Sequence, residues 1–161
     1  MVSNISLNQF APNNPIAGLY VYMANLPQLH NVIVSKTQTT ALAPGAIVTL
    51  DATATNPHAP VAKQAAVADA IFGVVTFNPI QNRFKAGERI AIARDNDIVW
   101  LPAAAAITEG ATLYFTADNE VTSTATAGNS IIGKALTPAT AKGDFVQVEL
   151  RFSQTQAAGG S

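Results

Sequence analysis

The chain has 161 residues and a net charge of −1, with 48% apolar but only 12% charged residues. This length fits one domain with a terminal extension. The nine Lys and Arg are scattered, so nucleic acid is not expected as a partner. The absence of cysteine excludes disulfides, thiolate metal sites and thiol nucleophiles. The low charge favours a surface partly covered by other subunits, and the alternative is a monomer with a Thr, Ser and Asn surface.

The start of the chain lacks the basic region and apolar core of a secretory signal. No run approaches the roughly 20 apolar residues that span a bilayer. We therefore expect a soluble protein, made in a cytoplasm, with no membrane partner.

Residues 1–40 differ from the rest in their Pro residues, a Thr/Gln tract and two short β-like runs at 18–23 and 31–35. So short a segment cannot bury a core of its own. We predict an extended N-terminal arm over residues 1–40 and a β domain over residues 41–152. The polar and glycine-rich residues 153–161 are expected to form a disordered tail.

Within the β domain, a glycine after a turn-like approach precedes a short β-branched or alternating run four times, at Gly45, Gly87, Gly110 and Gly143. Glycine accepts the positive φ that such turns often need. The last run, 145–152, alternates so that Val146 and every second residue after it point inward. These patterns predict a strand after each of the four glycines.

Two further apolar runs contain an internal glycine, Gly73 and Gly133, which is typical of a bulge or of close approach by another backbone. Turn glycine, internal glycine and turn glycine then recur in the same order along the chain. We interpret this recurrence as a weak internal duplication of residues 41–94 against residues 106–152. The alternative is that any all-β chain places glycine before its strands.

Short strands between turn clusters predict an all-β fold, a small antiparallel β-barrel or sandwich with little helix. Residues 61–68 and 102–106 are the two stretches that could instead be helical. Asp95-Asn96-Asp97 is interpreted as a hairpin turn between residues 90–93 and 98–101, because it does not fit a calcium loop. Asp118-Asn119 is interpreted as a second turn.

The sequence shows little sign of catalysis. His30 and His58 are isolated from each other and lack the spacing of metal ligands. The ten acids are dispersed, and neither a phosphate-binding loop nor a Gly-x-Ser-x-Gly motif is present. We expect no enzyme activity, no catalytic or metal-binding residues and no cofactor. A hydrolase triad assembled in space is a weak alternative.

Five segments together resemble the small capsid decoration, or structural cement, proteins of tailed bacteriophages. These segments, within residues 41–152, are 72–75, 86–93, 105–110, 132–136 and 143–148. The resemblance implies a β-rich module on the outer surface of a phage head. It implies an oligomer, with a trimer favoured over a dimer, that binds across joints between major capsid subunits after the head expands. It also implies synthesis in the bacterial host cytoplasm and brings no catalytic residues.

An extended arm can add a strand to the edge of a neighbour's sheet. We expect its larger apolar and aromatic residues to contact capsid or subunit neighbours, namely Phe10, Leu19, Tyr20, Tyr22 and Met23. The alternative is that they pack on the chain's own barrel. A rival function is a receptor- or carbohydrate-binding virion module, such as the base of a head fibre, which would need exposed aromatic side chains.

Overall fold

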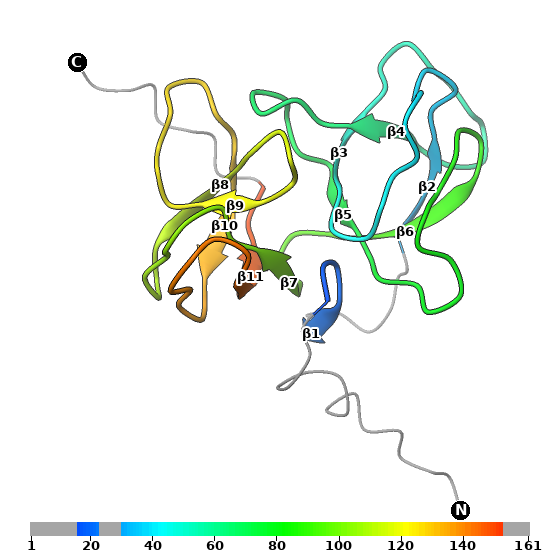
Figure 1. Cartoon of the computed structure of the whole chain (residues 1–161). Coiled ribbons are helices and arrows are strands. Elements are labelled where there is room, and N and C mark those ends of the chain that lie inside the picture. The colour runs from blue at the N-terminus through cyan, green and yellow to red at the C-terminus, as the bar shows by residue number, and fades with distance from the viewer. Residues whose placement is uncertain (1–15, 23–29, 153–161) are drawn as a thin grey trace, which may run out of the picture.

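The computed structural model describes residues 16–22 and 30–152 and shows strands, turns and no helix among them. This confirms the all-β prediction. Figure 1 shows two groups of strands side by side, with β1 between them. The strands are β1 (Tyr20–Tyr22), β2 (His30–Val34), β3 (Ile47–Leu50), β4 (Val61–Gln64), β5 (Gly73–Val75), β6 (Arg89–Ala93), β7 (Ile98–Pro102), β8 (Thr112–Phe115), β9 (Val121–Thr122), β10 (Ile131–Ala135) and β11 (Phe145–Leu150).

The first group, residues 30–94, is called the barrel unit, because its strands close in the order β2-β4-β3-β5-β6. All of its pairs are antiparallel except β2–β4, which is parallel. Alternate side chains point inward and form one apolar cluster that includes Val34, Val48 and Ile92. The barrel unit therefore has an interior core of its own.

The second group, residues 95–152, is called the sheet unit, and its strands follow the order β7-β11-β10-β8-β9. β11 alternates between half-buried and buried residues, as the sequence predicted. A parallel bridge joins Ala103 to Val121, and the amide of Ala104 donates to the carbonyl of Val121 at 2.8 Å. This bridge draws the two ends of the sheet unit together as the β2–β4 pair does in the barrel unit.

The two units share strand order and also register. Gly73 lies opposite Val48 in the barrel unit, and Gly133 lies opposite Leu113 in the sheet unit. The β5–β6 and β10–β11 pairs match in the same way, with Val75 opposite Ile92 and Ala135 opposite Val148. These matched registers support the proposed internal duplication of residues 41–94 and 106–152.

The glycines occupy the conformations that the sequence predicted. The four turn glycines all have positive φ, between 81° and 90°. The two internal glycines are closely approached: a Cβ on Gly133 would meet the carbonyl oxygen of Glu149 and lie 3.1 Å from Leu150 Cα. On Gly73, a Cβ would lie 2.8 Å from the carbonyl oxygen of Ala93. Strand pairing thus leaves no space for a side chain at either position.

Three local interpretations need correction. Residues 95–97 do turn, but they do not form a hairpin, because β6 and β7 pair in different units. Residues 61–64 form strand β4 and are not helical, and residue 102 ends β7. In each case pairing with strands distant in the sequence overrides the local preference. Asp118-Asn119 is a turn between β8 and β9, as predicted.

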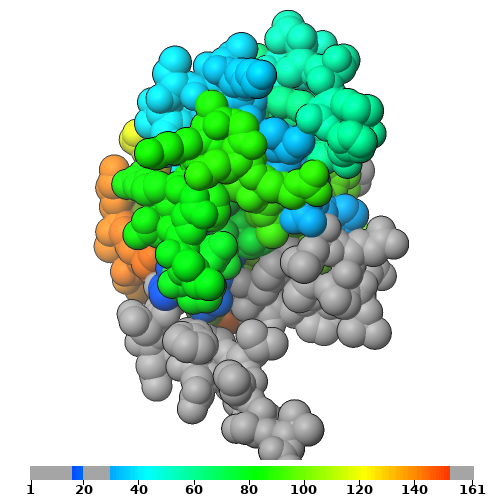
Figure 2. Space-filling view, turned by 90° about the vertical axis from the view of Figure 1, so that its right-hand side faces the viewer, coloured from blue at the N-terminus to red at the C-terminus, as the bar shows by residue number. Residues whose placement is uncertain are grey.

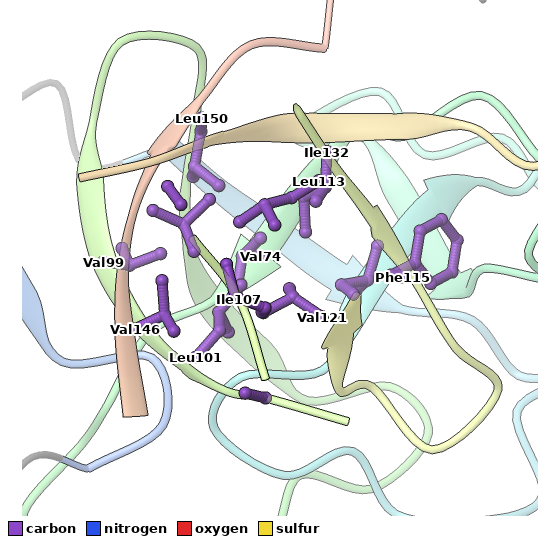
Figure 3. Packing of buried hydrophobic residues seen from close by; sticks show 14 of the residues in the cluster. Val74, Val99, Leu101, Ile107, Leu113, Phe115, Val121, Ile132, Val146 and Leu150 are labelled. Carbon is purple, nitrogen blue, oxygen red and sulfur yellow. The ribbon is translucent and has the colours of Figure 1, made fainter. Parts of the chain in front are cut away.

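The two units also share a core. Ile47, Val74 and Ala93 of the barrel unit belong to the same apolar cluster as the interior of the sheet unit. Figure 3 shows Val74 reaching among Ile107, Leu113 and their neighbours. Polar bonds join the units as well, such as the amide of Ile47 to Asn119 Oδ1 at 3.0 Å. The units are therefore packed against each other.

Residues 30–34, on the arm side of the expected boundary at residue 40, form β2 of the barrel. We propose that the arm ends before residue 30 and that the β domain begins there. The expected tail, 153–161, lies outside the described residues.

Candidate functional site

Strand β1 lies on the free edge of β7, on the chain's own sheet. Tyr20 is opposite Val99 and Tyr22 is opposite Ile98, in an antiparallel pairing with an irregular register. Of the proposed contact residues, Leu19, Tyr20 and Tyr22 are thus brought together at this edge. Phe10 and Met23 lie outside the described residues. Their role as contacts with a neighbour remains a prediction.

Gly18 holds the segment before β1 between the two units. Its amide donates to the carbonyl of Trp100 at 2.9 Å, and its carbonyl accepts from the amide of Phe77 at 2.9 Å. Its φ is +73°, and a Cβ there would lie 2.7 Å from the amide nitrogen of Gly45. Only glycine suits this position. We call this junction of the units, where Gly18 meets Gly45, Phe77 and Trp100, the seam.

A small hollow of about 130 Å³ opens at the seam. Its walls are mostly small and apolar and include Ala17, Pro44, Ala46 and Pro102, with Asp118 and Asn119 from the β8–β9 turn. Asp118 is exposed and forms no ion pair with another described residue. We call this feature the seam hollow, an apolar depression with a free carboxylate on its lining.

The β5–β6 loop, residues 76–88, breaks the equivalence of the units. Eight residues separate Val75 from Phe84, whereas three separate the matching residues Ala135 and Ala139. The longer loop contains a turn in which Asn78 Oδ1 accepts from the amide of Ile80 at 2.9 Å. This turn holds Ile80 out with 94% of its surface exposed. In Figure 2 the green residues around this loop stand forward on the face shown.

Charge is divided unequally between the units. The barrel unit has six Lys and Arg against three Asp and Glu, and the sheet unit has three against seven. Residues 1–29 and 153–161 contain none of these charged residues. The barrel unit therefore has a formal side-chain charge of +3 and the sheet unit of −4. Opposite charges on two packed units give the molecule two electrostatically different surfaces.

The positive charge concentrates at the β5–β6 loop. Arg83, Lys85 and Arg89 are exposed and form no ion pair with another described residue. A fourth cation, Lys36, is also exposed and follows the end of β2. The end of β2 contacts the loop, since the carbonyl of Val34 accepts from the amide of Gly87 at 2.8 Å. The loop contains one acid, Glu88, whose carboxylate accepts hydrogen bonds from the amide of Lys85 at 2.6 Å and from the side-chain amide of Gln81 at 2.9 Å.

A polar cluster anchors the other long loop of the barrel unit, between β3 and β4. The buried carboxylate of Asp51 accepts from the hydroxyls of Ser35 at 2.5 Å and Thr53 at 2.7 Å. Donation by Ser35, then by the hydroxyl and amide of Thr53, holds the pKa of Asp51 far below its ordinary value, although burial opposes this shift. These bonds tie the β2–β3 turn to the β3–β4 loop, and their role is structural.

Neither a cluster of metal-binding side chains nor a membrane-spanning helix occurs in the part of the chain that the structure describes. No group of three His, Cys, Asp or Glu among these residues could hold a metal ion. His30 and His58 are both exposed, on β2 and in the β3–β4 loop. None of the described residues forms a helix that could cross a membrane.

The fold and the seam define a class, an all-β protein of two matching units with an N-terminal strand fixed between them. A family model for phage cement proteins matches residues 53–150. The chain therefore belongs to the phage cement protein family, which confirms the resemblance seen in the sequence. This membership makes it a structural protein of a bacteriophage head, associated with the capsid in the virion.

A solved structure is similar in fold. It is the N base of the head fibre gp8.5 of bacteriophage phi29, with a TM-score of 0.53 and 12% sequence identity. The similarity covers 79% of this chain and 96% of that one. At this identity the likeness concerns the fold alone. No curated protein matches the sequence significantly.

Proposed function

We propose that the protein binds the outer surface of the expanded phage head as a homo-oligomer, with a trimer favoured, and cements neighbouring major capsid subunits. Its two-unit architecture carries this proposal. A cement must contact at least two subunits, and one chain here presents two packed units of opposite charge. A protein that binds only the assembled shell stabilises that shell by mass action.

The N-terminal arm supplies a further contact in this proposal. Residues 1–15 precede the seam, where Gly18 is bonded to both units. Chain that starts from a fixed point can reach a neighbour without moving the β domain, and an extended segment can pair with an open sheet edge. Phe10 and the other named arm residues are the contacts that we propose.

The role needs no catalysis and no cofactor. Family membership favours a structural role. The isolated, exposed histidines favour it as well, since acid–base chemistry needs groups within hydrogen-bond reach of one another.

The test is the stability of expanded heads with and without this protein. Heads reconstituted with the protein should release their DNA at a higher temperature than bare heads, and the gain should saturate at a fixed number of copies per shell. Unexpanded heads are the control and should bind far less. Equal release temperatures for decorated and bare expanded heads would refute cementing.

The fold likeness to a head-fibre base favours a second candidate function, a virion surface module that supports a fibre or binds a receptor or carbohydrate. Exposed aromatics are what sugar binding would require, but Trp100 is only 9% exposed. Binding on a glycan array, together with unchanged head stability, would favour this candidate over cementing.

A further inference from the structure

The β5–β6 loop is longer than its counterpart in the sheet unit and exposes an apolar side chain at its tip. The matching loop of the sheet unit makes the same crossing with five fewer residues. The longer loop half-buries Phe77, whose amide donates to the carbonyl of Gly18, but it leaves Ile80 at its tip 94% exposed. A single exposed isoleucine is common on protein surfaces, so the case for a partner depends on the charged residues around it.

The surroundings of Ile80 indicate what kind of partner it fits. Arg83, Lys85 and Arg89 are exposed around the loop without carboxylate partners among the described residues. The complementary surface would therefore be a small apolar depression beside free carboxylates. The seam hollow has this chemistry: small apolar walls, a volume of about 130 Å³ and the exposed carboxylate of Asp118.

We propose that the β5–β6 loop docks on a second copy of this chain, with Ile80 in that copy's seam hollow and the loop cations facing Asp118. The loop belongs to the unit of charge +3, and Asp118 belongs to the unit of charge −4. Charge complementarity between the unlike units of two copies therefore favours this occupant. The inference deepens the proposed function, because it assigns the contact by which the homo-oligomer forms.

The contact also fits a closed assembly. It joins two different patches, so each copy offers a loop to one neighbour and a hollow to the other. Contacts of this heterologous kind close into rings when the rotation between copies allows it. A closed ring of any size satisfies every loop and every hollow, and the trimer favoured above is one such ring.

The experiment measures mass in solution by light scattering, without any capsid. The native chain of 16.7 kDa should give an oligomer, about 50 kDa for a trimer. Arg83→Glu, Asp118→Arg and Ile80→Ser should each weaken association by about ten-fold or more. The double variant Arg83→Glu/Asp118→Arg should regain association, because the charges then face each other in reversed order.

Controls separate the contact from general effects. Lys134→Glu reverses an exposed charge on β10 that does not line the seam hollow, and it should leave the mass unchanged. Each variant should keep the native far-ultraviolet circular dichroism spectrum, since the altered side chains are exposed, although weaker association lowers the thermal midpoint of the oligomer. High salt should weaken the native oligomer by screening its charges.

Two results would overturn the inference: a native chain that stays monomeric at all concentrations, or an oligomer unaffected by all three single variants. The first result would also remove the homo-oligomer from the proposed function, but neither result bears on the stabilisation of heads, which is measured separately. Conversely, the mass measurements could follow the expected pattern while decorated heads are no more stable than bare heads. That pair of results would refute cementing and support the contact between copies.

Discussion

At the scale of single residues, the fold depends on positions where a neighbour's backbone occupies the space of a side chain. Gly133 is such a position, since β11 passes directly over it. Gly87 differs, because nothing lies within 4 Å of its Cβ position and only its φ of +83° demands glycine. Glycine is therefore required at Gly133 for lack of space and at Gly87 for its backbone conformation.

We expect Gly133→Ala to destabilise the protein more than Gly87→Ala. The first substitution must push β10 and β11 apart, at a cost of about 3 kcal/mol. The second places alanine in a left-handed conformation, at a cost of about 1 kcal/mol. Urea unfolding of both variants measures the difference, and equal losses would show that β10 and β11 separate easily.

Asp51 gives a second prediction at this scale, on pH. Its folded-state pKa lies below its unfolded value, so its bonds stabilise the native state fully above the unfolded pKa of about 4. That stability is lost as pH falls through the folded pKa. We expect Asp51→Asn to unfold at lower urea than the native chain at pH 7, and the gap to narrow below about pH 4. A gap independent of pH between 7 and 2 would contradict this role.

At the scale of elements, β1 and the residues before it have separable roles. Deleting residues 2–15 leaves Gly18 and β1 in place, whereas deleting residues 2–24 also removes their bonds to Trp100, Phe77 and β7. We expect the shorter deletion to keep the native thermal midpoint and to lose binding to expanded heads. The longer deletion should lower the thermal midpoint and also lose binding to expanded heads. Full head occupancy by the shorter variant would refute the arm as a capsid contact.

Much of the local structure could be predicted from the sequence, because its signals are local. Glycine at positive φ marked the starts of strands, and alternation marked the inward face of β11. The closure of the barrel by β2 could not be predicted, since β2 pairs with β4 and β6, which come much later in the chain. The false hairpin at residues 95–97 has the same origin, because a turn does not specify the partners of its strands.

The candidate contact surface was harder to predict. The proposed arm contacts are large apolar or aromatic residues, and the structure describes only part of that segment. Ile80 is a single apolar residue after Asn78-Pro79, which is typical of a turn, so its local sequence does not indicate a contact. The signal that could have identified it is the unequal spacing of the two repeats, which places extra residues at that loop. The division of charge between the units could also be predicted, because the charged residues can be counted in each half of the sequence.

At the scale of the whole molecule, the shared core makes the two units one folding unit. Val74 belongs to the barrel unit but is fully buried in the cluster that fills the sheet unit. Trp100 lies in the sheet unit. A loss of packing at Val74 should therefore be felt by Trp100 across the boundary between the units.

We expect the native chain to unfold in one transition, with Trp100 fluorescence and far-ultraviolet circular dichroism giving the same midpoint. Val74→Ala should lower both midpoints together, by about 2 kcal/mol of unfolding free energy, because it leaves a cavity in the common core. Val34→Ala is the matched control, since Val34 is equally buried but lies in the separate barrel cluster. If the units were independent, Val34→Ala would shift the dichroism midpoint and leave the Trp100 midpoint in place. Two coincident shifts for both variants would instead show that the unfolding of either unit removes the other, because the shared core joins them.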